Sequence, residues 1–396
     1  MLPSLPKRGF AYRADAIRRG WRIGVRRVKM HGPRSDWGSA MDVGIQMVFA
    51  SKGWDGITDG QVYAEELRLA RLAEHLGFDV LWSVEHHFFD YSFCPDNTQL
   101  LSYLAGVTTR VDLGTAAVIM PWNDPLRVAE KVALLDHLCD GRLRFGMGRG
   151  LSRREYAAFG EIDMGESRDR FDESSTMVLD ALRTGFIEGD GPYYKQPRIE
   201  IRPRPERSFD GRVYAVASSD DSVEAAARLG ARMVMFADKA WEHRMPSIER
   251  WRSLYREHHD AEPPAPMTCD FSVCLADADE AAETARLHLG VYLASVMEHY
   301  EVMGEHFAAT KGYDAYARAA ETLRGIGDAG FLKGFMKAAA WGTPDRVLSV
   351  LDERRKLMGP FEECTAFRFG GIPYETAERS MRLYAKEVLP VIKQWD

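Results

Sequence analysis

The most constraining feature of this chain is a regular alternation of short, largely apolar segments with longer amphipathic ones, which begins near residue 41. Segments such as DVGIQMVF and DVLWSV are rich in branched and aromatic residues, as buried parallel strands are. Strands that alternate with helices predict a parallel sheet covered by helices. The predicted strands are residues 42–49, 79–84, 111–120, 142–146, 213–217, 232–236 and 363–369.

The segments between these strands carry helix start and stop signals. Thr58 and Asp59 offer a helix start, and apolar residues follow at helical spacing until Gly77, a residue type suited to ending a helix. Pro125 stands where a proline is favoured in the first turn of another helix. Further helices are predicted at about residues 100–107, 125–138, 221–229, 342–358 and 374–392. The fold class is therefore predicted to be α/β.

Two α/β architectures fit this pattern, an open doubly wound sheet and a closed (β/α)8 barrel, and periodicity alone does not distinguish them. No GxGxxG turn opens a helix after the first strand, which weakens a dinucleotide-binding open sheet. A length of 396 residues suits a single barrel domain. The less regular stretch at about residues 265–337 is interpreted as an elaboration between late barrel elements, within one domain of residues 41–396.

The first forty residues differ in character from the rest. Ten Lys or Arg and a single acid, Asp15, lie between Met1 and Arg34, with no periodic apolar face and no apolar core of an export signal. We interpret residues 1–40 as a basic, disordered leader or as the product of an upstream start codon. An Arg-rich targeting peptide is the alternative interpretation.

Charge and cysteine usage restrict the possible partners and compartment. A net charge of −7 argues against a nucleic-acid partner, which would need a basic surface. The five cysteines are scattered without CxxC spacing, so the sequence predicts neither a disulfide framework nor a zinc site. No apolar run reaches the length of a membrane span. These features predict a cytoplasmic protein.

The triplet Glu85-His86-His87 directly follows the predicted strand DVLWSV. In a barrel, residues just past the carboxyl end of a strand line the active-site face. An imidazole, with an ordinary pKa near ~6.5, can exchange a proton there at neutral pH. Adjacent side chains at a strand end point in different directions, so one histidine is expected to face the site. A structural pair oriented by Glu85 is an alternative, and a metal site is another, although no further ligand cluster supports it.

The segment Gly146–Gly150 ends another predicted strand and contains Arg149. Glycines let the backbone approach a ligand closely, and an arginine among them offers a forked cation for a phosphate. Arg168, after the following loop, is a second candidate phosphate contact, with a solvated surface ion pair as the alternative.

Three other groups of residues can be interpreted either as part of a ligand site or as structural residues. Ser218–Ser222 open a helix after a strand and can bind an anion or simply cap that helix. The small residues Gly114–Ala117 can let a flat ring lie against the backbone or relieve crowding in a barrel. Aromatic residues that can wall an apolar pocket, or belong to the core, are Trp82, Phe88, Phe89, Trp122 and Phe236.

Taken in order, these segments resemble the bacterial luciferase family of flavin-dependent monooxygenases, and in particular its catalytic subunits. The resemblance rests on residues 78–88, 111–151, 213–222 and 341–353, which include FDVLWSVEHHF and WGTPDRVLSVLDE. It extends over most of residues 41–393, and the region of about 241–340 is outside the clear match.

The resemblance implies a (β/α)8 (TIM) barrel that binds reduced FMN, supplied by a separate NAD(P)H:flavin reductase. Dioxygen would add to the C4a carbon of the flavin, and the resulting peroxide would deliver one oxygen atom to a small, apolar organic substrate. It also implies a homodimer or a heterodimer.

The resemblance assigns roles residue by residue. His86 falls on the family's catalytic acid/base, with Glu85 and His87 in support. Ala116-Ala117 matches a non-proline cis peptide packed on the isoalloxazine ring. The other positions that match flavin contacts are Arg149, Leu151, Arg168, Val216, Ser219 and Ser222, with the arginines directed at the 5′-phosphate.

Some residues depart from the family pattern. Ser218 stands in place of an acidic residue, Ser152 in place of tyrosine, and Phe236-Ala237 in place of a polar–aromatic pair, so light emission is not inferred. Three alternatives stay open: a deazaflavin (F420)-dependent hydride-transfer enzyme of the same superfamily, a non-catalytic flavin-binding subunit, and metal-assisted hydrolysis on the same barrel.

Overall fold

The computed structural model describes residues 41–160 and 162–395, except for the side chain of Ala315. The predicted leader, residues 1–40, lies outside the described residues. Eight parallel strand positions close into a barrel, because β3 pairs with β5 and completes the order β3-β2-β1-β11-β10-β9-β8-β5. The predicted (β/α)8 barrel is therefore confirmed.

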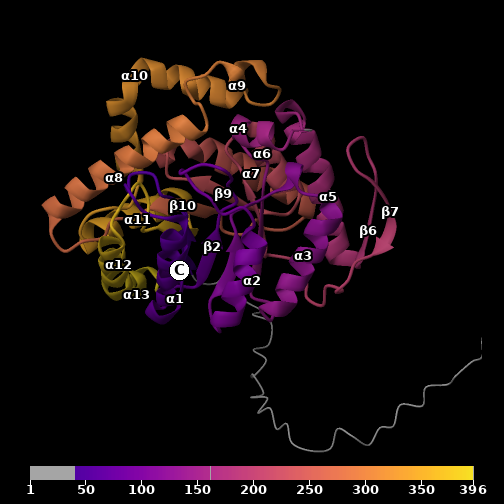
Figure 1. Ribbon diagram of the computed structural model, residues 1–396, viewed down its shortest axis with the longest axis horizontal. Coiled ribbons are helices and arrows are strands. Elements are labelled where there is room, and N and C mark those ends of the chain that lie inside the picture. The colour runs from indigo at the N-terminus through magenta and orange to yellow at the C-terminus, as the bar shows by residue number, and fades with distance from the viewer. Residues whose placement is uncertain (1–40, 161, 396) are drawn as a thin grey trace, which may run out of the picture. The chain divides into compact units, whose positions relative to one another are not determined.

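The barrel strands are β1 (Val43–Met47), β2 (Val80–Ser83), β3 (Asp112–Thr115), β5 (Leu143–Gly148), β8 (Val213–Val216), β9 (Arg232–Phe236), β10 (Met267–Phe271) and β11 (Glu362–Ala366). β4 (Val118–Ile119) continues the line of β3 beyond Ala116 and Ala117 and pairs with β5. A separate antiparallel hairpin, β6 (Phe186–Asp190) and β7 (Lys195–Glu200), extends beside α5 (Figure 1).

The helices that surround the barrel are α1 (Asp59–Leu76), α2 (Asn97–Val107), α3 (Pro125–Leu138), α4 (Arg153–Ala158), α5 (Ser167–Thr184), α6 (Asp220–Arg228), α7 (Met245–His259), α11 (Pro344–Met358), α12 (Tyr374–Leu383) and α13 (Leu389–Ile392). Three more, α8 (Ala278–His299), α9 (His306–Ala309) and α10 (Asp314–Ala338), stand between β10 and α11. Short helical turns are η1 (Met120–Trp122), η2 (Met164–Glu166), η3 (Trp241–Arg244) and η4 (Tyr384–Val388).

The predicted start and stop signals act as expected. The Thr58 side chain accepts a hydrogen bond from the Gln61 backbone N–H, and Gln61 reciprocates in a capping box. Gly77 ends α1 in the left-handed conformation, with φ of 95°. Pro125 stands in the first turn of α3, after the capping side chain of Asp124.

One barrel strand, β10, was not predicted, and the stretch interpreted as an elaboration, about residues 265–337, begins with it. The segment reads MTCDF, so two polar residues interrupt the apolar run. Both are nevertheless fully buried, because Arg354 of α11 donates hydrogen bonds to Thr268 and Asp270. The polar residues of this buried ion pair interrupt the apolar pattern, so hydrophobic periodicity did not predict the strand. The inserted helices that follow β10 begin with α8.

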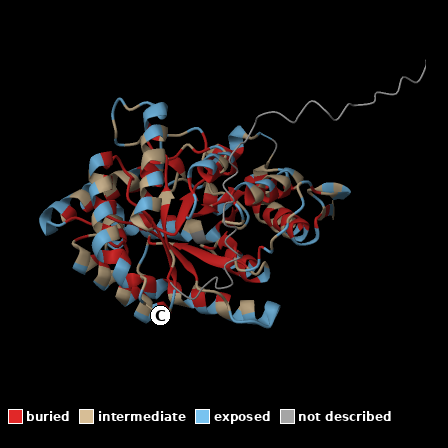
Figure 2. Ribbon diagram, turned by 90° about the horizontal axis from the view of Figure 1, so that it is seen from below, coloured by how far each residue is buried: buried red, intermediate tan, exposed pale blue. Residues whose placement is uncertain are grey.

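The interior of the barrel is divided between apolar and charged layers. Val80, Trp82, Val234 and Cys269 form part of an apolar cluster inside it. Nearer the amino-terminal ends of the strands, the buried Arg144 guanidinium bonds Asp112 at 2.8 Å, with Asp42, Glu362 and the Tyr214 hydroxyl around it. A larger apolar layer lies between strands and helices, and Figure 2 shows the buried strands at the centre of the ribbon.

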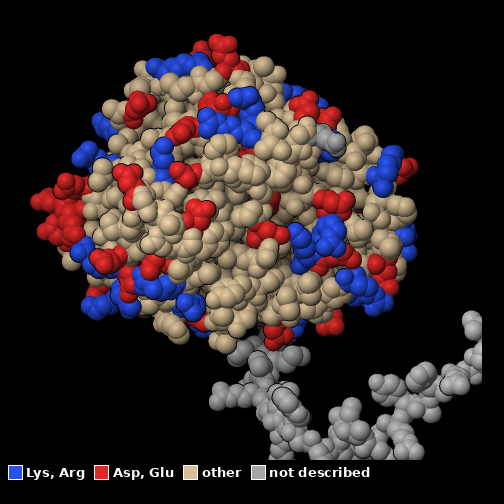
Figure 3. Space-filling model, viewed as in Figure 1, with Lys and Arg blue, Asp and Glu red and all other residues tan. Residues whose placement is uncertain are grey.

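The surface charges and the helices bear on two kinds of partner, nucleic acids and membranes. On the face shown in Figure 3, basic and acidic side chains are interspersed, so this face offers no continuous basic track for a nucleic acid. Within the described part of the chain, no helix is both long enough and apolar enough to cross a membrane.

Glu66 of α1 makes the stability of the fold depend on pH. Burial raises the pKa of Glu66 to about 7, although the charge of Arg368 acts in the opposite direction. The folded state therefore holds a proton that the unfolded chain releases near pH 4.5. The stabilising contribution is fully present below that pH and is lost as the pH rises through about 7.

We expect Glu66→Gln to remove this pH dependence. At pH 8 the variant should be more stable than the parent by up to about 3 kcal/mol in the free energy of unfolding, and at pH 4 the difference should nearly vanish. Urea denaturation at the two pH values measures this. Equal differences at both values would show that Glu66 does not titrate in this range.

Candidate active site

The predicted site residues come together at one end of the barrel. His86 follows β2, the Ala116-Ala117 peptide follows β3, Arg149 follows β5, and Ser219 follows β8. Parallel strands end on the same rim, which explains how residues far apart in sequence share one site. This rim is the candidate active site.

Glu85 is buried and holds the neighbouring loop in place. Its carboxylate accepts hydrogen bonds from the Ile119 backbone N–H at 3.0 Å, the Trp122 indole at 2.6 Å and the Asn123 amide at 3.1 Å. Its bonds thus fix the segment after β4 and not the ring of His86. Of the two histidines it approaches His87, whose Nε2 lies 3.4 Å from its Oε1.

The two adjacent histidines have different surroundings, as expected at a strand end. The His87 ring packs against Phe88, Trp122 and Phe159, with centroid distances of 5.3, 5.9 and 5.0 Å. The His86 ring instead lies 5.0 Å from Tyr91 and remains 17% exposed. His86 is therefore the histidine of the pair that is more accessible at the rim.

Glu155 of α4 is the direct partner of His86. Its Oε1 lies 3.2 Å from His86 Nδ1 and accepts a hydrogen bond from the His87 backbone N–H at 2.8 Å. Burial would raise the pKa of this carboxyl, but the neighbouring imidazoles of His86 and His299 outweigh it and hold the pKa well below its ordinary range. Glu155 is thus a buried carboxylate beside the candidate acid/base.

His299, at the end of α8, approaches the same carboxylate from the inserted helices. Its Nε2 lies 3.7 Å from Glu155 Oε1, and its ring stacks on Tyr91 at 4.6 Å. Both ring nitrogens are buried and have no hydrogen-bond partner among the described residues. Burial lowers the pKa of His299, which favours the neutral ring.

Neither Glu155 nor His299 was predicted. They stand 69 and 213 residues from His86, and neither lies in a motif that marks it as functional. Together with His86 they offer ligand atoms that all lie within 4.8 Å of one another, which could hold a metal ion. No ligand spacing in the sequence marks this group, because the fold assembles it from distant segments.

The two candidate phosphate arginines lie near each other. Arg149 is almost fully buried, donates from both terminal nitrogens to the Gly312 carbonyl at 3.1 Å, and lies 4.1 Å from the Tyr313 ring centre. Arg168 makes one long bond to Asp172 at 3.5 Å, and its Nε is buried without a partner among the described residues. Burial and then the charge of Arg149 lower the pKa of Arg168. Two close guanidinium groups would both be stabilised by an anion.

Ser219 and Ser222 cap α6. The Ser222 hydroxyl accepts from the backbone N–H groups of Ser219 at 2.8 Å and Ser218 at 3.0 Å. Of the two roles considered for Ser218–Ser222, anion binding and helix capping, the structure shows capping. The start of α6 still lies close enough to the arginines for Asp221 to interact electrostatically with Arg168.

Small and apolar residues line the rest of the rim. The Ala116-Ala117 peptide is cis, and the Asn97 amide donates to the Ala117 carbonyl at 3.1 Å. Ala116, Val216 and Phe236 are partly buried and pack on the apolar cluster inside the barrel. The predicted contact Leu151 packs instead in an aromatic cluster with Tyr156, Phe307 and Tyr313.

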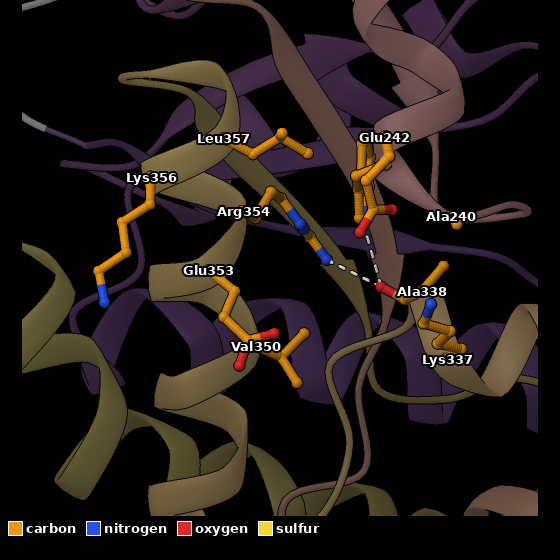
Figure 4. A pocket seen from close by; sticks show the side chains of 10 residues that line it. Ala240, Glu242, Lys337, Ala338, Val350, Glu353, Arg354, Lys356 and Leu357 are labelled. Atoms are coloured by element: carbon orange, nitrogen blue, oxygen red, sulfur yellow. Dashed lines mark hydrogen bonds between the residues drawn. The ribbon is translucent and has the colours of Figure 1, made fainter.

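A separate pocket of about 420 Å³ lies between η3, the end of α10 and α11 (Figure 4). In it, Arg354 and Trp241 both donate to the Ala338 carbonyl at 3.2 Å. Its lining carries both acids and bases, namely Glu242, Glu353, Lys337 and Lys356. It contains none of the predicted site residues, and its mixed charges indicate no particular ligand.

The family model for luciferase-like monooxygenases matches residues 41–359. The chain belongs to this family. The alpha chain of alkanal monooxygenase from Photorhabdus laumondii is 26% identical over an alignment of 345 residues, and the match covers 84% of this chain and 93% of that protein. The predicted resemblance and the prediction of a monooxygenase are confirmed at the level of the family.

Several solved structures share the barrel. Monooxygenase RslO1 from Streptomyces bottropensis superimposes with a TM-score of 0.73 at 28% identity, over 89% of this chain and 99% of that one. The oxygenating constituent of 3,6-diketocamphane monooxygenase from Pseudomonas putida, in complex with FMN, gives 0.66 at 18% identity, over 89% and 98%. The F420-dependent tetrahydromethanopterin reductase from Methanopyrus kandleri gives 0.63 at 18%, over 90% and 100%. The last two likenesses concern the fold alone.

Proposed function

We propose that this luciferase-like protein is a two-component monooxygenase. It would take reduced FMN from a separate NAD(P)H:flavin reductase and transfer one oxygen atom of O2 to a small, apolar organic substrate. The observation that carries this proposal is the rim itself, where an imidazole on a buried carboxylate shares one end of the barrel with two neighbouring guanidinium groups.

The rim offers what a flavin nucleotide needs. Ala116, Val216 and Phe236 give a small, apolar surface on which a flat ring can lie. Arg149 keeps N–H groups beyond the two that bond Gly312, and Arg168 has a buried Nε with no partner among the described residues. A phosphate between these guanidinium groups would relieve their repulsion and satisfy that donor. The residues present therefore fit FMN.

The residues of the rim would have different roles in the reaction. When bound, reduced FMN supplies the electrons that activate dioxygen. His86 would give or take one proton at the reacting atoms, while Glu155 holds its Nδ1. Glu85 and His87 would act as positioning residues through the loop after β4. Aromatic residues around them, such as Trp122 and Phe159, would keep water away.

The test is an oxygen-dependent product screen with a flavin reductase. We expect binding of FMN and a product heavier by one oxygen atom from a labelled O2 atmosphere. Binding of the deazaflavin F420 with hydride transfer and no oxygen uptake would replace the proposal by the F420 alternative, which the barrel also fits. FMN binding with only substrate-independent peroxide release would indicate a non-catalytic subunit.

We expect Arg149→Ala to weaken FMN binding about tenfold to a hundredfold while turnover at saturating flavin changes much less. A charge-assisted hydrogen bond to phosphate contributes about 1.5–3 kcal/mol, and Arg149 is placed to bind rather than to react. Quenching of flavin fluorescence gives the dissociation constant. Arg127→Ala, at an exposed arginine of α3, is the control. An unchanged dissociation constant would contradict the phosphate role.

We propose that α2 and α3 form a dimer interface with a second copy or a related subunit. These neighbouring helices each expose two apolar side chains four residues apart, Tyr103 and Val107 on α2 and Leu134 and Leu138 on α3. The spacing places each pair on one helix face.

The double variant Leu134→Glu, Leu138→Glu should therefore sediment as a monomer at micromolar concentration, where we expect the parent chain to be a dimer. Charged side chains are costly to bury in an apolar interface, so the two glutamates should prevent association. Both positions are exposed in the single chain, so the fold should tolerate the substitutions. A dimer that survives both substitutions would place the interface elsewhere.

We also propose that residues 41–396 act as one catalytic unit in the cytoplasm. The five cysteines are all free and buried, which suits a reducing compartment.

A further inference from the structure

The Glu155 carboxylate joins two imidazoles that come from opposite parts of the chain. Its Oε1 lies 3.2 Å from His86 Nδ1, on the loop after β2, and 3.7 Å from His299 Nε2, at the end of α8. The two rings meet nearly at right angles, with centroids 5.4 Å apart. Two histidines thus share one buried anion.

The contact with His86 determines which ring nitrogen carries a proton. A carboxylate that is ionised can only accept hydrogen bonds, so the proton of a neutral His86 ring belongs on Nδ1. The second nitrogen, Nε2, is then left to accept or deliver a proton at the rim. The His87 backbone N–H bonds the same oxygen at 2.8 Å and fixes its position relative to His86.

Within the part of the chain that the structure describes, the ring nitrogens of His299 do not contribute to the stability of the fold through hydrogen bonds. Its side chain is 1% exposed, and neither nitrogen has a hydrogen-bond partner among the described residues. An unsatisfied polar group in such a place costs stability, whereas a phenyl ring would stack on Tyr91 equally well. The imidazole is therefore better explained by its approach to Glu155 than by packing.

The inserted helices supply this second imidazole. α8 also carries Tyr292 and reaches Tyr300, whose hydroxyls lie 3.3 and 3.4 Å from that of Tyr91. Titratable groups that contact the His86 ring in the described part of the chain include Tyr91, Tyr300, His299 and Glu155. Of these, the Glu155 carboxylate is charged at neutral pH. The surroundings of His86 are complete only with α8 in place.

We propose that Glu155 and His299 are positioning residues for His86. Glu155 holds the His86 proton on Nδ1, and the N–H dipole of His299 Nε2, 3.7 Å from the same oxygen, favours the ionised carboxylate directed at His86. This inference rests on the proposed function, since it assigns how the acid/base of that reaction is oriented.

The test uses the full-length protein and three variants. Glu155→Gln keeps an oxygen for the His87 N–H but removes the charge. His299→Phe keeps the ring that stacks on Tyr91 but removes both nitrogens. His306→Phe is the matched control, because His306 also lies among the inserted helices and contacts Phe307 rather than Glu155. Its Nε2 is buried and has no hydrogen-bond partner within the part of the chain that the structure describes.

Four measurements separate the possible outcomes. Nitrogen-15 NMR of histidine-labelled protein without flavin should place the His86 proton on Nδ1, and Glu155→Gln should shift it toward Nε2. Oxygenation should fall at least about tenfold in Glu155→Gln and severalfold in His299→Phe, with the FMN dissociation constant unchanged and His306→Phe at the parent level. The melting temperature of His299→Phe should stay the same or rise.

Other results would overturn the proposal in distinguishable ways. A His86 proton on Nε2 in the parent chain contradicts the role of Glu155 whether or not the chain oxygenates anything. Full activity in His299→Phe would show that His299 only packs in the core and does not position His86. A stoichiometric metal ion in the purified protein, lost in Glu155→Gln, would make the three residues a metal centre. Failure of the monooxygenase assay with the expected NMR signature would instead count against the proposed function alone.

Discussion

Replacing His86 with alanine should abolish most oxygenation while leaving FMN binding nearly intact. The His86 ring is the partly exposed imidazole at the rim, and its Nδ1 is held by the buried Glu155. A positioned acid/base typically contributes about 10²–10⁴-fold to a rate, so turnover should fall by that order. The flavin dissociation constant should change little, because the proposed phosphate and ring contacts lie on other strand ends.

The measurement needs both oxygen consumption and product. Without its proton donor or acceptor, the variant should still use reduced flavin and oxygen but release hydrogen peroxide in place of product. His75→Ala, at an exposed position of α1, controls for the loss of a histidine elsewhere. Unchanged product formation in His86→Ala would remove this residue from the mechanism and leave the proposed reaction without its acid/base.

Replacing Arg144 with methionine should lower the free energy of unfolding by about 3–5 kcal/mol, the usual cost of breaking a buried ion pair from one side. Arg144 is fully buried and lies between the carboxylates of Asp42, Asp112 and Glu362. Methionine fills much of the same volume but leaves these anions without that cation. Arg232 still pairs with Glu362 at 3.1 Å, which limits the loss.

Urea denaturation gives the free energy of unfolding for this comparison. The matched control is Arg183→Met, because Arg183 pairs with Asp180 on the surface of α5, where solvent screens the pair and its loss should change stability little. FMN binding by the folded Arg144→Met protein should match the parent, since the cluster lies toward the amino-terminal ends of the strands. A loss below about 1 kcal/mol would show that relaxation or water compensates for the missing guanidinium.

Most of the barrel could be predicted because its elements carry local signals. The capping box at Thr58 and Gln61 and the left-handed Gly77 arise from contacts within a few residues. β10 escaped prediction because Asp270 interrupts its apolar pattern, and the compensating Arg354 stands 84 residues away. A buried charge in a strand is recognisable only once its partner is known.

The residues of the candidate site also fall into those that local sequence places and those that only tertiary packing brings in. The sequence by itself determined the repeated strand–helix order, the placing of His86, Arg149 and Ser219 after strand ends, and hence their meeting on one rim, because these follow from local pattern and barrel geometry. The tertiary structure alone decided that Glu155 and His299 face His86 and that Gly312 faces Arg149. The contacts of His299 and Gly312 depend on the packing of the inserted helices, and that of Glu155 depends on how α4 lies against the loop after β2. No spacing along the chain encodes this packing.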